Sequence, residues 1–325
     1  MDNELVSAVV AIVGVPAALV GYVLLSERLI QAFPEKRQGR VRPWLWIAPA
    51  VLFLIVFLVY PTLNTVVNSF QDRASQEFVG LANYEWFFGD SSTLEALRNS
   101  VLWVVFMTAG VLGLGLLIAI LVDRVRYEAV AKTTIFIPLA ISFVAAAIIW
   151  KFMYEYKPPG TTQIGTVNAV TGLVGIGPYD WIRERSFLID NFALIFIGIW
   201  MWTGFAMVIL SAGLKGISTE LLEAARVDGA NEWQVFKGII FPLLLPTIFV
   251  VGITIVITAL KSFDIVFTLT NGAFGTDIIA RRMIEEISVT RHYGRASAIA
   301  IVLLVAIIPF MALNIRRFRE QEAIR

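Results

Sequence analysis

The stretch Glu223-Ala224-Ala225-Arg226-Val227-Asp228-Gly229-Ala230, followed by Ile239 and then Phe241-Pro242, decides how this chain is interpreted. It is polar and helix-forming, whereas the sequence on both sides of it is strongly apolar. A connector between two apolar stretches that has no role is more often short and variable, and function collects in ordered loops. The stretch therefore predicts a structured loop that is presented to a partner.

Local sequence signals predict two short helices in this loop. Ser218 or Thr219 is placed to cap the first helix, and acidic residues follow near its positive end. Gly229 supplies the backbone freedom that ends that helix sharply. Asn231, with Gln234 three residues later, resembles a capping box that starts the second helix.

The composition is that of a membrane protein. Of 325 residues, 58% are hydrophobic, and the mean hydropathy is +0.77, so too little polar surface is available to face water. A net charge of +1 gives no argument for a nucleic-acid partner. Cysteine is absent, histidine occurs once, at His292, and no GxxxxGK[ST] loop is present. These facts argue against disulfides, thiolate or histidine metal sites, and ATP hydrolysis by a phosphate-binding loop.

Seven apolar stretches are each long enough to cross a hydrocarbon layer of roughly 30 Å. We therefore predict an all-α, polytopic membrane protein with seven spans. The predicted spans are Leu5–Leu25, Leu45–Leu63, Asn99–Val122, Thr133–Lys151, Phe192–Gly213, Leu243–Leu260 and Ala296–Leu313. Asp2 and Glu4 stand where a secretory signal carries Lys or Arg, and no cleavage pattern follows Leu25, so the first stretch is interpreted as a retained span.

The distribution of basic residues predicts the orientation. Lys and Arg are more numerous in the connectors on the side of Ser26–Pro43 and of the C-terminal tail than on the opposite side. Six of these arginines closely flank their spans: Arg37, Arg40, Arg42, Arg316, Arg317 and Arg319. We expect the N-terminus outside, the C-terminus inside, and the loop around 223–242 in the cytoplasm.

The predicted spans lack the features of an ion-coupled carrier. Lys151, Lys261 and Asp264 fall at span ends, and no ionisable residue lies well inside a span. Carriers of that class use buried titratable groups or broken helices at mid-depth. Because neither is visible in the sequence, we expect the driving energy to come from another protein.

Small and aromatic residues suggest packing and a transport path. Gly110, Gly113 and Gly115 predict a close approach of helices. Pro242 and Pro246 predict a bend at the entry to the sixth span. Most tryptophans and tyrosines lie near span ends and are interpreted as an interfacial belt.

Five residues within the fifth and sixth spans are candidates for a translocation path. They are Trp200, Trp202, Thr203, Thr254 and Thr258. Aromatic rings pack on the C–H faces of sugars, and nearby polar groups bind sugar hydroxyls. For any single threonine, hydrogen bonding between helices is the favoured interpretation.

The connector Ser262–Arg295 contains a turn signal at Asn271-Gly272 and could partly re-enter the membrane or form an outer flap. Arg281-Arg282 and Glu285-Glu286 have the spacing of i,i+4 pairs, which favours a charged surface helix.

The loop resembles the EAA loop of importer-type ABC transporter permeases, because several residues hold that family's spacing together. The motif comprises Glu223-Ala224-Ala225, Gly229, Ile239 and Phe241-Pro242. Its extended form, with Asp228-Gly229-Ala230, Trp233, Phe236 and Pro246, is similar to the carbohydrate branch of the family. Further resemblance lies in Trp202–Phe205, Leu214–Ile217, Lys261–Asp264 and Gly294–Ala298. The C-terminal half, including Asn314–Arg319, looks most like alpha-glucoside permeases.

Three positions depart from the family pattern. Ser218 stands where proline is frequent, and Phe241 replaces the usual leucine before Pro242. Thr270–Gly275 replaces a more common Thr-x-Gly-Gly-Pro pattern, which weakens expectations about that outer loop.

The resemblance implies a multi-pass permease subunit of a bacterial inner membrane. Residues 1–43 would form an extra span and a cytoplasmic linker, and residues 44–325 the six-span permease domain, with its coupling loop near 214–246. The implied partners are a second permease, two cytoplasmic ATPase subunits that bind ATP and Mg, and an extracytoplasmic sugar-binding protein. The chain itself would bind no cofactor or nucleic acid and would not be an enzyme.

The resemblance also assigns roles in the loop. Glu223 and Asp228 would contact the ATPase, Ala224 and Ala225 would allow close approach, and Gly229 would form the turn. Ile239 and Pro242 would continue the motif into the next span. The implied substrate is an alpha-glucoside such as a disaccharide, or glucosylglycerol. A secondary carrier or channel, a membrane enzyme, and a permease for peptides or phosphate are the alternatives.

Overall fold

The computed structural model describes residues 7, 10–123, 125–184 and 187–322. Every regular element in these residues is a helix, and one isolated bridge pairs Gln71 with Phe78. The prediction of an all-α chain is confirmed for the described residues. The chain divides into two compact units, Met1–Val67 and Asn68–Arg325, which are described separately.

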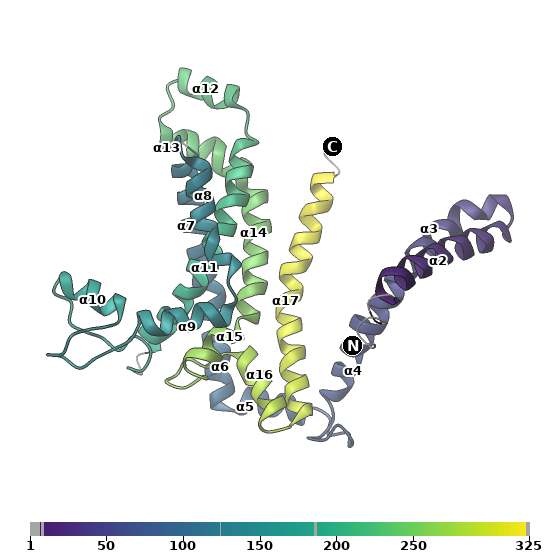
Figure 1. The fold of residues 1–325 in the computed structure, drawn as a ribbon, viewed down its shortest axis with the longest axis horizontal. Helices are drawn as coiled ribbons and strands as arrows, with labels where there is room; N and C mark the ends of the chain where they lie inside the picture. The colour runs from purple at the N-terminus through teal and green to yellow at the C-terminus, as the bar shows by residue number, and fades with distance from the viewer. Residues whose placement is uncertain (1–6, 8–9, 124, 185–186, 323–325) are drawn as a thin grey trace. The chain divides into compact units, whose positions relative to one another are not determined.

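The first unit is a helical hairpin (Figure 1). It contains η1 (Val10–Gly14), α2 (Val15–Gln31), α3 (Glu35–Leu54) and η2 (Ile55–Val59), and continues into α4 (Tyr60–Asn68). The Tyr22 hydroxyl donates to the Leu45 carbonyl, and Arg42 lies 2.9 Å from Glu27, so two contacts join α2 to α3. The start of the predicted first span lies outside the described residues, and the helix extends beyond the predicted end at Leu25.

The second unit is a helical bundle. Its elements are α5 (Ala82–Gly89), α6 (Ser91–Leu102), η3 (Trp103–Met107), α7 (Thr108–Val122), α8 (Glu128–Phe136), η4 (Ile137–Ala140), α9 (Phe143–Met153), α10 (Thr166–Leu173), α11 (Phe187–Lys215), α12 (Thr219–Val227), α13 (Glu232–Val235), η5 (Phe236–Ile240), α14 (Phe241–Lys261), α15 (Phe263–Leu269), α16 (Ile279–Ser288) and α17 (Tyr293–Glu322).

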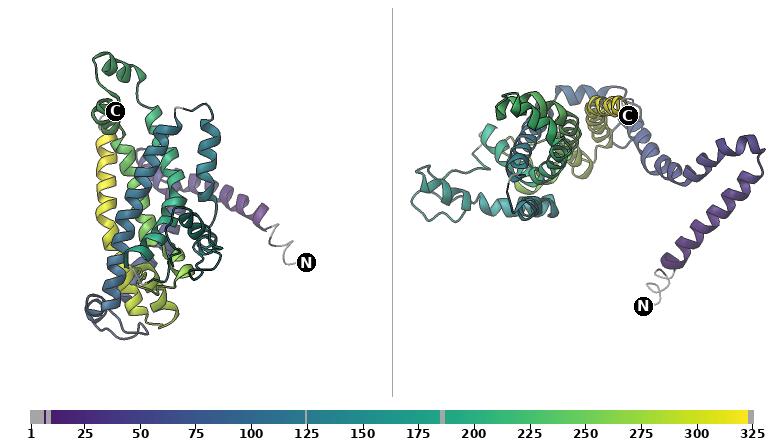
Figure 2. Two further views of the ribbon diagram at one scale, coloured as in Figure 1. Left: turned by 90° about the vertical axis from the view of Figure 1, so that its left-hand side faces the viewer. Right: turned by 90° about the horizontal axis from the view of Figure 1, so that it is seen from above.

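The helices α7, α11 and α14 pack on one another along the bundle (Figures 1 and 2). The helix α12 projects from one end of this unit, and the C-terminal part of α17 reaches the same end. The helices α5, α10 and α16 lie toward the other end. The coupling-loop region and the C-terminal tail thus share one end, as the predicted topology requires.

Among the described residues, six helices are long and apolar enough to cross a membrane, or seven if a bent pair counts as one span. The helices extend beyond several of the predicted apolar cores. The helix of the sixth predicted span runs over Glu232–Leu269, and that of the third over Ser91–Val122. The seven-span count and the orientation stay predictions.

The fourth predicted span, Thr133–Lys151, is broken, so the expectation of unbroken spans is wrong. Glu128–Ala140 and Phe143–Met153 meet at 101°. Pro138 enters a short 3-10 turn, and Ser142 then restarts the helix by accepting a hydrogen bond from the Ala145 amide at 3.1 Å. Apolar composition shows neither the turn nor the change of direction.

The charged helix α16 is not the surface helix that its i,i+4 spacing predicted. Arg281 and Glu286 are buried. Arg281 does pair with Glu285 at 2.7 Å, and it also pairs with Asp277 in the preceding turn. Its neighbour Arg282 reaches Asp90 at 3.1 Å. The charges therefore join α16 to the turn before it and to Asp90 at the N-cap of α6.

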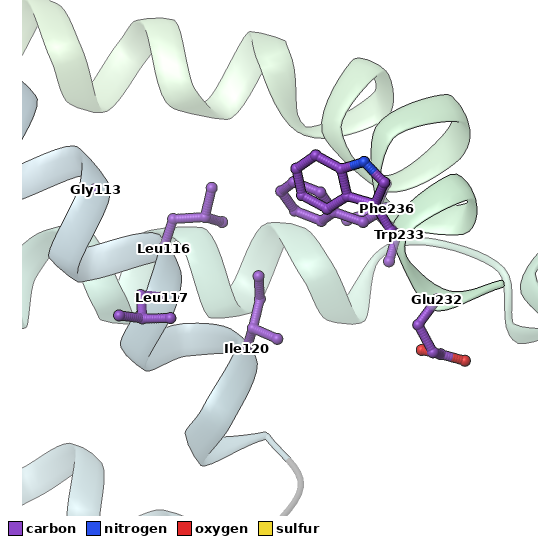
Figure 3. Close-up of a pocket in the computed structure, with 8 residues that line it drawn as sticks. Gly113, Leu116, Leu117, Ile120, Glu232, Trp233 and Phe236 are labelled. Atoms are coloured by element: carbon purple, nitrogen blue, oxygen red, sulfur yellow. The ribbon is translucent and has the colours of Figure 1, made fainter.

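Two of the three glycines on α7 allow α11 to approach closely. A Cβ on Gly115 would lie 2.6 Å from the Cβ of Ala206, and one on Gly110 would lie 2.5 Å from Ile199. Gly113 is different, because a Cβ there would meet nothing within 4 Å. It faces an open groove toward α13 (Figure 3). The predicted packing role is confirmed for Gly110 and Gly115 and is wrong for Gly113.

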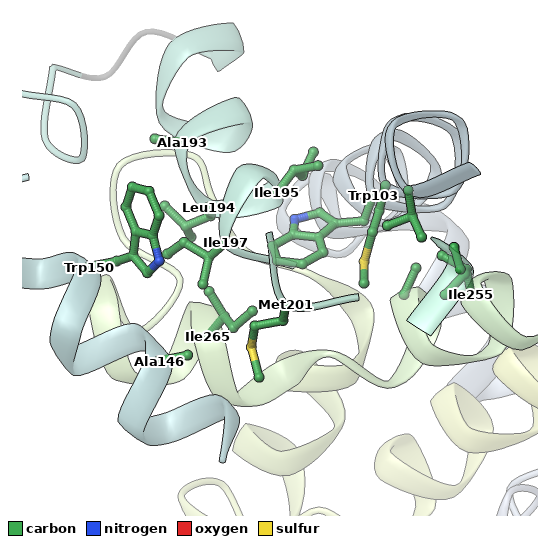
Figure 4. Close-up of a cluster of buried hydrophobic side chains, with 14 of the residues drawn as sticks. Trp103, Ala146, Trp150, Ala193, Leu194, Ile195, Ile197, Met201, Ile255 and Ile265 are labelled. Atoms are coloured by element: carbon green, nitrogen blue, oxygen red, sulfur yellow. The ribbon is translucent and has the colours of Figure 1, made fainter. Parts of the chain in front are cut away.

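The main core lies where α9, α11, α14 and α15 meet the start of α7 (Figure 4). Trp103, Met107 and Leu194 are fully buried there. Trp150 packs edge-on against Phe196, with ring centroids 5.2 Å apart. Because lipid is as apolar as these side chains, van der Waals packing is what favours their association.

The glycine pair on α7 provides a matched test of packing. Gly115→Leu should force α7 and α11 apart and lower the free energy of unfolding by about 1–3 kcal/mol. Gly113→Leu, two residues away, should change it little because its space is open. Thermal unfolding of the detergent-solubilised chain measures both, and equal melting temperatures for the two variants would contradict the packing role.

The predicted orientation is testable because the chain has no cysteine. Val227 on α12 and Leu173 on α10 are each 87% exposed. In oriented membrane vesicles, a membrane-impermeant thiol reagent should label Val227→Cys from the cytoplasmic face only. It should label Leu173→Cys from the opposite face only, and the reverse pattern would invert the topology.

Candidate functional site

The loop between α11 and α14 is the candidate site. Lys215 ends α11, and Ser218 stands at the N-cap of α12. Ser218 makes no side-chain capping bond, so it has the predicted position without the predicted hydrogen bond. No residue of α12 is buried, although the structure describes all nine. The helix therefore lies outside the buried core of the bundle.

A Schellman motif ends α12. Gly229 has φ +90°, a backbone conformation that glycine adopts without strain. The Ala230 amide donates to the Ala225 carbonyl at 3.0 Å, and the Gly229 amide donates to the Arg226 carbonyl at 3.1 Å. The predicted stop at Gly229 is confirmed.

A complete capping box begins α13. The side-chain oxygen of Asn231 accepts a hydrogen bond from the backbone N–H of Gln234 at 2.9 Å. The side-chain oxygen of Gln234 accepts one from the backbone N–H of Asn231 at 2.8 Å. Each residue satisfies a donor that a helix start leaves unpaired. The predicted restart at Asn231 is also confirmed, so the end of α12 and the start of α13 are both fixed.

A charged pair joins the two helices of the loop. Arg226 Nε donates to Glu232 Oε1 at 2.8 Å, and a second nitrogen lies 3.4 Å from Oε2. This two-point contact raises the pKa of Arg226 through its hydrogen bond with Glu232. Both side chains are exposed, so the pair orients α12 more than it stabilises the fold.

The loop is continuous with the sixth predicted span. A single helical path runs over Glu232–Leu269. Its π-helical turn, η5, comes directly before Phe241-Pro242, and Pro242 is the second residue of α14. A displacement of α13 therefore acts directly on α14.

The structure brings most of the predicted coupling residues together. Glu223, Ala224, Asp228 and Gly229 are exposed, and Ala225 is half-buried. Ile239 and Pro242 lie apart from them, on the helix that follows. Three residues add exposed apolar surface to the loop. Leu221 is 45% exposed, Val227 87% and Trp233 67%.

A groove of about 430 Å³ lies beside the loop. Figure 3 shows Leu116, Leu117 and Ile120 of α7 facing Trp233 and Phe236. Glu232 stands at its edge. The two walls of this groove are far apart in the chain, so the sequence alone does not predict it.

The five predicted path residues lie on α11 and α14, which pack on each other. The hydroxyls of Thr203, Thr254 and Thr258 donate to carbonyls of their own helices, at 2.7, 2.9 and 2.8 Å. The Trp200 ring packs against Trp150 at 5.6 Å. The indole N–H of Trp202 is buried and has no acceptor among the described residues. None of the five lines the groove between α7 and α13.

Within the described residues, no group of three or more His, Asp or Glu side chains could hold a metal ion. The loop offers a preformed helix with exposed acidic and apolar side chains.

Comparisons with known proteins agree with this geometry. Residues 111–317 match the family "Binding-protein-dependent transport system inner membrane component". The osmoprotective compounds uptake permease protein GgtC of Synechocystis sp. is 53% identical over 86% of this chain and 100% of its own length. The alpha-glucoside transport system permease protein AglF of Rhizobium meliloti is 46% identical over 85% of this chain and 82% of its own.

A solved structure shares the fold. It is a bacterial ABC transporter involved in the import of the acidic polysaccharide alginate, with a TM-score of 0.72 and 22% identity over 87% of this chain and 99% of that one. The family match and the two relatives confirm the resemblance carried by the EAA loop. This chain belongs to the inner-membrane components of binding-protein-dependent transport systems, the permeases of ABC importers.

Proposed function

We propose that this chain is one permease of an ATP-driven importer that carries an alpha-glucoside, a disaccharide or glucosylglycerol, into the cytoplasm. The observation that carries the proposal is α12 itself, a helix with no buried residue and a fixed C-terminal end, which is followed by α13 and its continuous connection to α14. A surface with this shape and with exposed apolar side chains fits a groove on a partner protein.

In this proposal α12 docks into a cytoplasmic ATPase subunit. Glu223 and Asp228 make charge-assisted contacts, and Ala224 and Ala225 allow the partner backbone to come close. Two such ATPases bind ATP and Mg, and their closure displaces α12. Because α13 continues into α14, the displacement tilts a membrane helix.

The proposed path runs between α11 and α14. Trp200 and Trp202 offer rings for the C–H faces of a sugar, and the buried indole N–H of Trp202 offers a hydrogen-bond donor. Thr203, Thr254 and Thr258 add hydroxyl oxygens along the same two helices. A second, related permease completes the path in the inner membrane, and an extracytoplasmic binding protein delivers the sugar.

The names of two relatives support the substrate class. One is a permease for osmoprotective compounds and the other a permease of an alpha-glucoside transport system. The identities of 53% and 46% extend over most of this chain, including the helices of the proposed path.

A secondary carrier without an ATPase is the second candidate, and the broken span favours it. Carriers place their binding sites where membrane helices are interrupted, and α8–η4 meets α9 at 101°. The two candidates differ in whether transport depends on α12.

Substitutions on α12 separate the candidates. In the assembled transporter, Glu223→Ala should reduce ATP-dependent uptake about 10- to 100-fold, since a hydrogen bond to a charged group contributes about 1.5–3 kcal/mol. Gly229→Val should have a similar effect, because φ +90° is strained for valine. Glu220→Ala, three residues from Glu223 and outside the motif, is the control. Full uptake in both motif variants, or uptake by this chain alone, would favour the carrier.

The path is tested by uptake of labelled alpha- and beta-glucosides into proteoliposomes that contain the assembled transporter. Trp202→Ala should raise the half-saturating sugar concentration about tenfold, equivalent to about 1.4 kcal/mol, by removing the ring. Trp202→Phe should retain part of the affinity because an aromatic face remains. Equal uptake of alpha- and beta-glucosides would contradict the substrate class.

A further inference from the structure

A cluster of charged side chains lies at the base of the coupling loop. It consists of Asp123 after α7, Glu128 and Lys132 of α8, and Lys215 at the end of α11. We call these four residues the α8 ion cluster. Lys215 Nζ lies 2.6 Å from Glu128 and 3.6 Å from Asp123, and Lys132 also donates to Glu128.

Glu128 is the centre of the cluster, because one of its carboxylate oxygens accepts from lysines on two different helices. Lys132 in turn donates to the hydroxyl of Ser211, which is 1% exposed on α11. The side chains of Glu128 and Lys132 are 27% and 19% exposed, so water screens their contact only in part. An isolated surface ion pair has neither a shared carboxylate nor a buried hydroxyl beyond it.

The cluster lies next to the moving element of the proposed mechanism. Lys215 is separated from Ser218, the N-cap of α12, by two residues. The two intervening residues, Gly216 and Ile217, are both held in tight turns. The Gly216 backbone amide donates to the Gly213 carbonyl at 3.2 Å, and the Ile217 backbone amide donates to the Leu214 carbonyl at 3.1 Å. A displacement of α12 therefore reaches Lys215 through a short, ordered connection.

The helix α8 is held against α11 at a second place. A Cβ on Gly204 would lie 2.4 Å from the Ile135 carbonyl oxygen, so the backbones of α11 and α8 are in direct contact there. With the ion cluster at one end and this contact near the other, α8 is positioned to follow α11. Beyond η4 the chain turns by 101° into α9, which lies toward the opposite end of the bundle.

We propose that Glu128 is a positioning residue that transmits displacement of α12 through α8 to the broken span and α9. The inference rests on the proposed function of α12. It adds a second route to the direct one through α13 and α14, and it gives the break at Ile141–Ser142 a role: rotation of α8 moves α9 sideways at the other end of the bundle.

The test uses the complete transporter in proteoliposomes, with ATP hydrolysis and sugar uptake measured on the same sample. Glu128→Gln keeps the volume of the side chain and removes its charge. We expect ATP hydrolysis within twofold of the unmodified transporter and uptake per ATP hydrolysed about tenfold lower. Asp123→Asn is the matched control, since Asp123 contacts Lys215 and makes no ion pair with α8, and it should leave both rates within twofold.

Charge reversal separates positioning from simple stabilisation. Glu128→Lys alone should lower the uptake per ATP hydrolysed. Glu128→Lys combined with Lys215→Glu should recover at least half of the uptake per ATP hydrolysed that the unmodified transporter shows. A purely structural role would instead lower hydrolysis, uptake and the amount of folded protein together in Glu128→Gln, and that result would overturn the proposal. So would full coupling in Glu128→Gln.

A distance measurement follows α9 directly. Spin labels at Phe152→Cys on α9 and at Val289→Cys after α16 use side chains that are 69% and 74% exposed. The distance between the labels should change on ATP binding in the parent protein and stay fixed in Glu128→Gln, and an equal change in both would overturn the proposal. Failure of the proposed function would appear separately, as absence of ATP-dependent uptake in the unmodified assembly.

Discussion

The close contact between α7 and α11 is the constraint on which the rest of the second unit depends. In a membrane, no hydrophobic force drives apolar helices together, so backbone approach and dense side-chain packing must do so. Gly110 and Gly115 leave room for Ile199 and Ala206, and this brings α11 into the middle of the unit. The helices α8, α9 and α14 then pack on α11, and the loop that contains α12 follows the C-terminal end of α11. A larger residue at Gly115 would disturb every one of these contacts.

Local chemistry made the coupling loop predictable. Gly229, Asn231 and Gln234 act on backbone groups within a few residues of themselves, so their effect can be identified in the sequence before any tertiary contact is known. The apolar lengths of the spans are predictable for a similar reason, since the thickness of the hydrocarbon layer sets them. The roles assigned to Glu223 and to the path residues on α11 and α14 stay predictions.

Features that depend on how the chain packs in three dimensions were not predicted from the sequence. The break at Ile141–Ser142 occurs in an apolar stretch of ordinary length, and the turn at Pro138 is compatible with either a kink or a straight continuation. The burial of Arg281 follows from Asp277, which forms its ion pair, and from the backbone of Gly272, which packs against it. The i,i+4 spacing of the charged residues, taken alone, predicted that they lie on the surface. Likewise, the groove at Gly113 exists only because α13 folds back over α7.

The fixed junction between α12 and α13 has a consequence for assembly. A segment that folds only when it binds loses conformational entropy at that step, and this loss weakens the complex. Here the Schellman motif and the capping box have ordered the backbone in advance, so recognition resembles the docking of two rigid bodies. Natural variants of the loop would then differ in their affinity for a partner mainly through their side chains, and antibodies raised against the free subunit would recognise the same shape as in the assembled state.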